Sequence, residues 1–474
     1  MGYTQKAVVV GAGISGLACA FRLKQLGVPC LVCEAKDRVG GLIATIRRNG
    51  FLFETGPQCP RFPASVWKLV HSLNLEKEFV AGDGKAKRYV FRNGRMHRAP
   101  FSPGALLTTR LLGLPSKWRL LAEAFRSSQP PLQEESLADF VQRKFGQEVL
   151  DNLVDPFIST IFLGNPHKMG MDSAFPILRQ WEKDQGSVVR GAVRAARSKP
   201  QNNSGNAWPP GSGSNGRRAT LHVTDALPSL GSFRSGMARL PERLAEMLGE
   251  QLRPSAEIVS ASPGRDPNGT GWQVSISNGD KIVTEHLVLA VPAYAAARLL
   301  AESAPQLSSR LLAIEYAPVC TVSSGYHRTQ VTNSLDGFGF MVPRRERLQA
   351  ICTFWNSSLF PGRAPQGHVV ISSLAGRAEG EPIGEEQCAR EVQAENSRAL
   401  GISGEPADRV VCRDLRALPQ YNVGHARRIK EIYEVLPEFP NLYLAGNFLS
   451  GRSIGDCVEI ADRVAEDLRR RVSD

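Results

Sequence analysis

Three glycines near the N-terminus, followed by an acidic residue, are the residues whose types and spacing could do specific chemistry. Gly11, Gly13 and Gly16 fit the pattern G-x-G-x-x-G, and Glu34 lies 23 residues after Gly11. Glycines at this spacing let a chain turn tightly, approach a pyrophosphate closely and pack a helix against a strand. A carboxylate at that distance can accept hydrogen bonds from a ribose diol. The pattern therefore predicts a dinucleotide site.

These residues need a strand, a helix and a second strand to position them. Residues 7–10 are a short apolar run typical of a buried strand, apolar residues recur at helical spacing over 17–21, and 30–33 is a second apolar run. The helix begins at the glycine turn, so its free amides and positive dipole point towards the phosphates. Glycines at this spacing are a weak signal alone, but strand, turn, helix and acid in register make it specific.

The continuation Arg38-Val39-Gly40-Gly41 points from a nicotinamide to a flavin. It resembles the R-x-G-G signature of a flavoprotein family that includes amine oxidases, carotenoid desaturases and protoporphyrinogen oxidases. The resemblance implies FAD, held noncovalently because the amine oxidases' flavin-linking cysteine context is absent. It also places Gly56-Pro57 against the flavin ring. The expected cofactor-binding residues are Gly11, Gly13, Ile14, Ser15, Gly16, Glu34, Ala35, Arg38, Gly40, Gly41, Leu42, Gly56, Pro57, Val259, Asn447, Ser453, Ile454 and Gly455.

A second anchor is expected near the C-terminus. A strand at 442–445 precedes Gly446-Asn447 and the run 451–457, and a helix continues from Asp456. The N-terminus of this helix points at whatever occupies the loop. It would stabilise the negative charge of a reduced flavin by about 0.3 to 1 kcal/mol, or more when buried.

The segment Lys87-Arg88-Tyr89, with the turn at 92–94, is similar to a segment of protoporphyrinogen oxidases in which the matching arginine reaches a carboxylate of the tetrapyrrole. Two parallel charge-assisted bonds from a guanidinium to a carboxylate are each worth ~1.5 to 3 kcal/mol. From the residues alone, a solvated surface arginine is the alternative. The resemblance implies that Arg88 binds a substrate carboxylate and that Gly164, Met341 and Phe354 position the ring. No side chain is assigned as a catalytic acid or base, since flavin N5 would carry the chemistry.

One departure from the family pattern concerns the second carboxylate of such a substrate. Gln58 follows Gly-Pro where some members carry an arginine. If a second cation is needed, Arg61 or Arg98 would have to supply it, and the sequence does not choose between them.

The resemblance implies oxidation of protoporphyrinogen IX to protoporphyrin IX, with dioxygen as acceptor and hydrogen peroxide as product. A coproporphyrinogen III oxidase forming coproporphyrin III is the close alternative. Another flavin amine oxidase or desaturase-like enzyme, or a flavin-free lipid-shielding carrier of the same fold, stays open beyond it. A homodimer is compatible with the resemblance.

Composition narrows the class of protein. The chain has 474 residues, 42% of them hydrophobic, and a net charge of +12, which suits an anionic substrate or an anionic lipid surface. The basic residues are dispersed, so no nucleic-acid partner is expected, and no metal-ligand spacing occurs. Nine scattered cysteines favour a reducing compartment, and Cys30 and Cys33 read as structural. No signal peptide or membrane span is visible, so the expected location is cytoplasmic, with peripheral attachment to the cytoplasmic membrane face as an option.

The predicted fold class is α/β: a Rossmann-type FAD-binding domain, a mixed-sheet substrate domain and an all-helical insertion for membrane contact or substrate access. Residues 198–218 are low in complexity, and we expect a mobile loop there. For 101–124, apolar residues interleaved with cations and Trp118 favour either an interfacial element or a core-packed helical hairpin. The expected divisions are 1–75, 226–292 and 411–474 for FAD binding, 76–100 and 293–410 for substrate, and 101–225 for the helical insertion.

Overall fold

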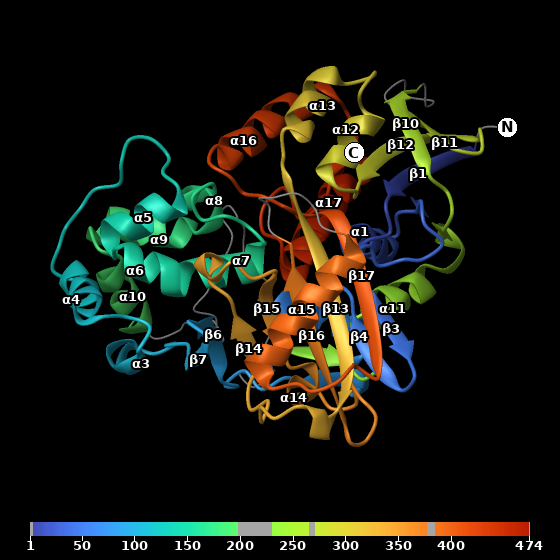
Figure 1. The fold of residues 1–474 in the computed structure, drawn as a ribbon. Coiled ribbons are helices and arrows are strands. Elements are labelled where there is room, and N and C mark those ends of the chain that lie inside the picture. Colours follow the sequence, from blue (N-terminus) through green and yellow to red (C-terminus); the bar gives the residue numbers. More distant parts are fainter. Residues whose placement is uncertain (1–2, 198–229, 265–270, 377–383, 474) are drawn as a thin grey trace.

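The computed structural model describes residues 3–197, 230–264, 271–376 and 384–473. Figure 1 shows two sheet regions and, set to one side of them, a group of helices coloured cyan to green. Both large sheets combine strands from distant parts of the chain, so the chain passes between these regions several times.

One sheet joins strands from the beginning, the middle and the end of the chain. Its strands are β1 (Tyr3–Val10), β2 (Cys30–Cys33), β9 (Leu252–Arg253), β10 (Ile258–Pro263), β11 (Trp272–Ile276), β12 (Lys281–Leu289) and β18 (Leu442–Leu444). The pairing order is β10-β11-β12-β1-β2-β9, and β18 also pairs with β12. The pairs β1–β2, β1–β12, β2–β9 and β12–β18 are parallel, which explains why β1 and β2 read as continuous apolar runs.

Helices cover this sheet. They are α1 (Ile14–Gln25), α2 (Ala64–Ser72), α11 (Arg239–Leu248), α12 (Ala293–Leu299), α13 (Pro305–Leu312), α16 (His425–Val435) and α17 (Ile454–Ser473). α1 packs against both α11 and α17, and Figure 1 shows α1 beside α17 at the centre of the molecule. Leu17 and Leu23 of α1 are fully buried in the same core as Val9 and Val288. The N-terminal and C-terminal parts of the chain therefore share one core.

The second sheet follows the order β17-β13-β16-β15-β14-β6-β7. Its strands are β6 (Arg88–Arg92), β7 (Arg95–Arg98), β13 (Tyr316–His327), β14 (Gly339–Met341), β15 (Ala350–Phe354), β16 (His368–Ala375) and β17 (Asp408–Pro419). β6 runs parallel to β14, and the other neighbours are antiparallel. α14 (Asn356–Leu359) and α15 (Glu385–Leu400) pack on this sheet.

Two hairpins turn at Asn-Gly pairs, and one of them contains the turn expected at 92–94. β3 (Thr45–Arg48) and β4 (Phe51–Glu54) turn at Asn49-Gly50, and β6 and β7 turn at Asn93-Gly94. All four turn residues have positive φ, as two-residue hairpin turns require. β5 (Phe79–Ala81) pairs with β8 (Gly231–Phe233). Short 3₁₀ turns cover Glu76–Glu78, Gly249–Gln251, Arg328–Gln330, Arg344–Glu346 and Leu436–Glu438.

The helical region spans residues 103–197 and has a core of its own. It comprises α3 (Pro103–Thr108), α4 (Leu114–Glu123), α5 (Leu137–Lys144), α6 (Gln147–Val149), a π-helical turn (Leu150–Val154), α7 (Asp155–Phe162), α8 (Met171–Ala174), α9 (Pro176–Gln185) and α10 (Val188–Arg197). Phe140, Ile158 and Phe162 are buried together in that core. In the chain, these helices follow β7 and precede β8, within the range 101–225 where the sequence predicts a helical insertion.

Buried charges tie α4, α5, α9 and α10 together. Lys144 Nζ lies 3.0 Å from a Glu182 oxygen and 3.3 Å from a Glu123 oxygen, and all three side chains are almost completely buried. Glu123 also accepts hydrogen bonds from the backbone amides of Val188 and Val189, at 2.9 and 3.0 Å. These are the free donors at the start of α10, where a carboxylate is favourable. Neighbouring Arg143 bonds Glu182, and these cations lower the pKa of Glu182 to about 2 despite its burial.

Left-handed residues set the ends of two helices. α2 ends at Ser72, because Asn74 adopts a left-handed conformation. α11 begins at Arg239, after Gly236 has turned with φ +94°. Segment 101–124 is packed in part, because Leu111 and Leu112 are buried whereas Leu114 and Trp118 are 73% and 71% exposed, so both alternatives stay predictions. The low-complexity stretch 198–218 lies outside the described residues.

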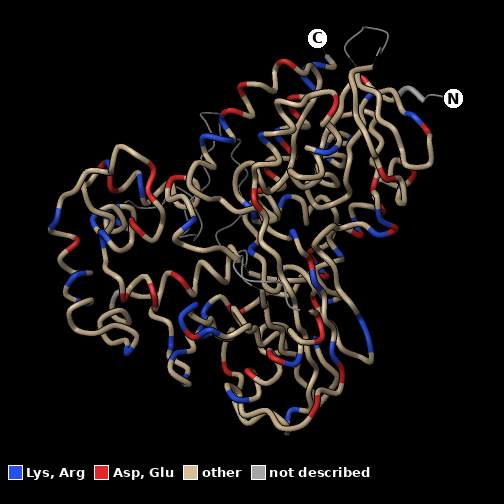
Figure 2. Tube along the Cα trace, turned by 45° about the horizontal axis from the view of Figure 1, so that its top comes forward, with Lys and Arg blue, Asp and Glu red and all other residues tan. Residues whose placement is uncertain are grey.

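Charge and hydropathy of the described part add two observations. Figure 2 shows lysines and arginines in every region of the trace, with acidic residues interspersed. Within the described ranges, no helix combines the length and the hydropathy that crossing a membrane would require.

The buried ion pairs of the helical region predict a large stability difference between two charge-removing substitutions. Lys144→Met should lower the free energy of unfolding by about 3 kcal/mol, because it leaves Glu123 and Glu182 with less compensation in a buried site. Arg427→Met is the control. Its exposed pair with Glu431 at 3.6 Å should contribute less than about 0.5 kcal/mol. Urea unfolding measures both, and equal losses would contradict the stabilising role of the buried pairs.

Candidate functional site

The three glycines of the N-terminal turn have three separate surroundings. Gly11 has φ +99°, and a Cβ on it would lie 2.7 Å from the carbonyl oxygen of Ala290. A Cβ on Gly16 would overlap the carbonyl oxygen of Gly11, so only glycine allows α1 to approach β1 this closely. A Cβ on Gly13 would have no heavy atom within 4 Å. Gly13 therefore faces open space at the start of α1, where a phosphate can reach the backbone.

The Glu34 carboxylate and the second glycine pair lie against this turn. Glu34 accepts hydrogen bonds from the amides of Ala12, at 2.7 Å, and Lys36, at 3.0 Å. Gly40 donates to the carbonyl oxygen of Ala12 at 2.8 Å and forms an isolated parallel bridge with Gly13. The acid and the R-x-G-G segment thus converge on the edge of the sheet where β1 and β2 end.

The C-terminal anchor lies beside the N-terminal one. Ser453 caps α17: its hydroxyl accepts from the amide of Asp456 at 3.1 Å, and the Asp456 carboxylate accepts from the Ser453 amide at 2.9 Å. Cys457, in the first turn of α17, contacts Ser15 in the first turn of α1. Two helix N-termini therefore meet at one place, and both favour negative charge there.

The segment after β4 closes against the glycine loop. A Cβ on Gly56 would overlap the carbonyl oxygen of Leu42, and the Thr55 amide donates to Ala44 O at 3.0 Å. Gln58, which is 4% exposed, donates to the carbonyl oxygen of Glu54 at 2.8 Å and accepts from Asn356 at 2.9 Å. Gln58 is therefore held by polar contacts and does not present a cation.

The segment that leads into β10 also lies beside Glu34. The Ala256 amide donates to the Glu34 carbonyl oxygen at 2.8 Å, three residues before Val259, whose side chain is 50% exposed. The strand that runs beside Glu34 is β9, whose Arg253 carbonyl accepts from the Glu34 amide at 2.9 Å. Leu252 of β9 lines a pocket of about 360 Å³ together with Arg38 and Val39. The sequence did not predict β9, because a strand of two residues is too short to show a pattern of alternating apolar and polar side chains.

Arg88 lies at the start of β6, opposite Gly339 of β14. Its guanidinium carbon lies 4.5 Å from the centroid of the Phe338 ring and 5.4 Å from that of Phe101. Burial lowers the pKa of Arg88, with Arg61 adding a smaller effect of the same sign. Within the described ranges, no carboxylate forms an ion pair with Arg88. It is a partly exposed cation flanked by aromatic rings, and its Nη1 lies 3.5 Å from the carbonyl oxygen of Gly84.

Arg61, rather than Arg98, shares the side of β6 on which Arg88 lies. Arg98 pairs with Tyr89 across the β6–β7 hairpin, so its side chain leaves the sheet on the face opposite to Arg88. Arg61 acts electrostatically on both Arg88 and Cys59. Arg61 is therefore the nearer of the two cations to Arg88, and its binding of a second carboxylate stays a prediction.

The residues around Met341 and Phe354, both expected beside the ring, divide into partly exposed and buried side chains. Phe338 and Phe354 are partly exposed and lie edge to face, with centroids 5.7 Å apart. Met341 is also partly exposed. Phe340 and Trp355, in the same two segments, are only 3% and 2% exposed, so they belong to the sheet's core.

Gly164 is held by residues that the sequence did not connect. Its carbonyl accepts from Arg344 at 2.8 Å, and the Arg344 amide donates to the Asp155 carboxylate at 2.6 Å. A Cβ on Gly164 would lie 2.7 Å from Gln420 Oε1. Asp155 and Gly164 therefore belong to one bonded unit centred on Arg344, which positions the end of α7.

Two further residues near the C-terminal anchor were not recognised from sequence. His425 is 2% exposed and stacks on Tyr421 at 4.4 Å, and neither ring nitrogen has a hydrogen-bond partner of normal geometry. Burial lowers the pKa of His425 to about 4. The Tyr421 hydroxyl donates to the carbonyl oxygen of Asn447. Arg452 stacks on Phe162 of the helical region.

The different surroundings of Gly13 and Gly16 predict two distinct failures. Gly13→Ala should change the unfolding free energy of the flavin-free protein by no more than about 1 kcal/mol, yet reduce bound flavin at least about tenfold, because its methyl group enters only the space left for phosphate. Gly16→Ala should cost about 3 kcal/mol or more of stability, because its methyl meets backbone. Flavin absorbance per protein and urea unfolding measure the two effects. Full flavin content in Gly13→Ala would contradict the placement of the phosphates.

Comparison with known proteins agrees with this geometry. The family described as flavin containing amine oxidoreductase matches residues 14–469. Protoporphyrinogen oxidase 1, chloroplastic, from Spinacia oleracea is 31% identical over 97% of this chain and 83% of its own length. Coproporphyrinogen III oxidase from Bacillus subtilis (strain 168) is 27% identical over 97% of each chain.

Solved structures have the same mixed α/β fold. A protein from Exiguobacterium sp. 255-15, provisionally named a protoporphyrinogen oxidase, matches with a TM-score of 0.80 at 23% identity, over 98% of this chain and 99% of that one. Cyclohexylamine oxidase from Brevibacterium oxydans matches with a TM-score of 0.67 at 15% identity, over 99% and 100%. The chain therefore belongs to the flavin-containing amine oxidoreductase family, which implies FAD as its cofactor.

Proposed function

We propose that this protein is an FAD-dependent oxidase that converts protoporphyrinogen IX to protoporphyrin IX, with dioxygen as acceptor and hydrogen peroxide as product. The observation that carries the proposal is Arg88, a cation flanked by aromatic rings and without a carboxylate partner in the described part of the chain. A porphyrinogen is an apolar disc with carboxylates at its rim, so it needs an apolar wall and a guanidinium together. Full-length relatives named as protoporphyrinogen oxidases support this choice.

The residues present fit a noncovalent FAD. Gly11, Gly13 and Glu34 would hold its phosphates and ribose, and the start of α17 at Ser453 would lie at its other end. When bound, the flavin supplies the acceptor for hydride from the reduced macrocycle. Gly56 leaves room for close packing beside that site.

The protein's own side chains would bind and orient the substrate. Arg88 would fix one carboxylate at the rim, with Arg61 close enough to bind a second. Phe338, Phe354 and Met341 would pack on the disc and exclude water from it. Orientation of the disc, rather than proton transfer by a side chain, is the contribution that the geometry supports.

The other reactions of the family are less well supported. Amine substrates are cations at neutral pH, and Arg88 with Arg61 would repel them. A carotenoid brings no charge to satisfy either guanidinium. A flavin-free carrier would not need the open approach at Gly13 or the cap at α17, both of which are present.

Coproporphyrinogen III is the second candidate substrate, because three cations gather near one position. The guanidinium groups of Arg61, Arg88 and Arg363 all lie close enough to the Cys59 thiol to lower its pKa, against the larger effect of burial. Arg363 is buried 3.7 Å from Glu54, so its charge is compensated within the fold. A substrate with additional carboxylates would use further cations, and a relative of similar length is named a coproporphyrinogen III oxidase.

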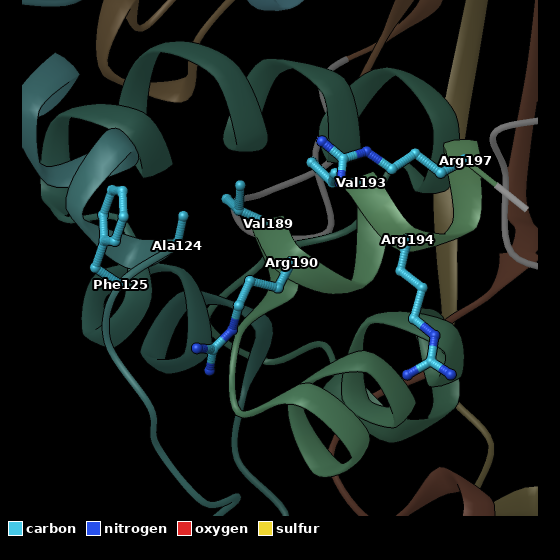
Figure 3. Close-up of a pocket in the computed structure, with 7 residues that line it drawn as sticks. All are labelled: Ala124, Phe125, Val189, Arg190, Val193, Arg194 and Arg197. Carbon is cyan, nitrogen blue, oxygen red and sulfur yellow. The ribbon is translucent and has the colours of Figure 1, made fainter.

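We also propose that the helical region contacts an anionic membrane surface. Leu114, Trp118 and Phe125 are 73%, 71% and 88% exposed. Figure 3 shows Phe125 facing α10 across a pocket of about 760 Å³. Its lining also includes Ala124, Val189, Arg190, Val193, Arg194 and Arg197. Exposed apolar side chains next to several arginines match the boundary between acyl chains and anionic headgroups.

The role of Arg88 predicts a selective effect on substrate binding. With protoporphyrinogen IX, Arg88→Ala should raise KM about tenfold to a hundredfold and leave kcat nearly unchanged, because the bond to a rim carboxylate is equally strong before and during hydride transfer. Arg98→Ala removes the same charge from the opposite face of the hairpin and should change KM less than about twofold. Porphyrin fluorescence measures the rates.

Three outcomes would count against the proposal. Turnover of coproporphyrinogen III alone would replace the substrate, and an Arg88→Ala enzyme with unchanged KM and kcat would remove the role of Arg88. If neither porphyrinogen is oxidised by flavin-loaded protein, the oxidase assignment itself is wrong.

The membrane proposal predicts flotation with vesicles that contain anionic lipid. The protein should float at low salt and less at high salt, because headgroup attraction is screened. Trp118→Asp should at least halve the floating fraction, by removing the most exposed aromatic of α4. Leu415→Asp, at a 59% exposed leucine of β17, is the control and should have no effect. Absence from the floating fraction at both salt concentrations would exclude the contact.

A further inference from the structure

Arg452 lies two residues before α17 and extends away from it. Its guanidinium carbon is 3.4 Å from the centroid of the Phe162 ring, and Nη1 donates to the carbonyl oxygen of Ile161. Both partners belong to α7 of the helical region, whereas Arg452 belongs to the loop that caps α17. Its charge therefore lies where the loop that caps α17 meets the helical region.

This charge has no counter-ion at contact distance. In the described part of the chain, the interactions of Arg452 are the bond to Ile161 and the stacking on Phe162. Asp456 acts on it through space, but its carboxylate bonds the Ser453 amide at 2.9 Å and hydroxyl at 2.7 Å. Burial lowers the pKa of Arg452 to about 9, so the side chain stays protonated at neutral pH.

A partly buried cation without a counter-ion is less stable than a paired one unless something else brings negative charge to it. The buried cation Lys144 has such a partner, Glu182, at 3.0 Å. The loop that carries Arg452 is the one expected to reach the flavin, and a flavin gains negative charge when it is reduced. The start of α17 adds positive potential at the same place.

We propose that Arg452 stabilises the negative charge of the reduced flavin and thereby raises the reduction potential of the cofactor. The inference rests on the flavin of the family and is independent of which porphyrinogen is the substrate. Because Coulomb interactions act beyond contact distance in a weakly screened site, Arg452 need not touch the flavin. Asp456, with the opposite charge, offsets part of the effect.

The test is the reduction potential of the flavin bound to the full-length protein, measured anaerobically at pH 7 against reference dyes. Arg452→Met keeps an unbranched side chain on Phe162 and removes the charge. It should lower the two-electron equilibrium constant for reduction at least about tenfold, which corresponds to about 30 mV. Arg452→Lys should restore most of the loss.

The control is Arg471→Met, near the other end of α17. Arg471 also lies over an aromatic ring, with its guanidinium carbon 5.6 Å from the centroid of Tyr443. It is about 25 Å along the helix from Ile454, so its removal should leave the potential unchanged. Asp456→Asn removes the opposing charge and should raise the potential.

An unchanged potential in Arg452→Met, with a lower melting temperature, would show that Arg452 only ties the α17 loop to α7. If Arg452→Met fails to hold flavin, Asp456→Asn and Arg452→Lys provide the test. The proposal is overturned if the potential does not rise in Asp456→Asn. It is also overturned if the potential of Arg452→Lys, which keeps the charge, falls by about 30 mV or more. Because no substrate is used, a protein that oxidises no porphyrinogen still gives a clear result.

Discussion

The close approach of α1 to β1 is the constraint on which the rest of the structure depends. It exists because Gly16 has no side chain to meet the carbonyl oxygen of Gly11. With α1 in this position, Ser15 contacts Cys457, and the N-terminus of α17 lies beside that of α1. Two helix dipoles and their free amides then favour negative charge at one edge of the sheet. A dinucleotide with two phosphates and a reducible ring is the ligand class that such an edge can hold.

The distribution of paired and unpaired cations separates stabilising charges from functional ones. In the helical region, Lys144 and Arg143 both bond Glu182, so burial is compensated within the fold. Arg88 and Arg452 are instead set against aromatic rings, and no carboxylate of the described residues forms an ion pair with either. Aromatic stacking offsets only part of the loss of hydration of a guanidinium. Ligand binding at these two positions, as proposed above, would supply further compensation.

The sequence was informative where structure is set by neighbouring residues. The glycine turn, the hairpins at Asn49-Gly50 and Asn93-Gly94, and the capped start of α17 all depend on interactions within a few positions. The mixed α/β class followed from those elements in order. Local interactions of this kind leave a period or a turn motif that can be read directly.

The sequence was not informative where a contact joins distant segments. Leu252 was missed because β9 takes its conformation from pairing with β2, more than 200 positions away. Arg344 bonds Asp155 and Gly164, which are distant from it in the sequence. The residues next to Arg344 in the sequence do not indicate that role. Phe340 is buried in the core of the sheet, whereas Phe338 is partly exposed beside Arg88. Residues of a strand alternate between its two faces, but β14 has only three residues, which are too few to show that alternation in the sequence.

Glycine has the same physical role in the substrate region as in the cofactor turn. A Cβ on Gly337 would overlap the carbonyl oxygen of Lys87, and one on Gly339 would overlap that of Thr353. Both have strongly positive φ, so β14 can lie tightly between β6 and β15 only with glycine at these positions. The Phe338 amide then bonds the Lys87 carbonyl oxygen at 2.7 Å, which brings the Phe338 ring over the Arg88 guanidinium. The pairing of cation and aromatic wall thus follows from backbone contacts, and it is fixed before any substrate binds.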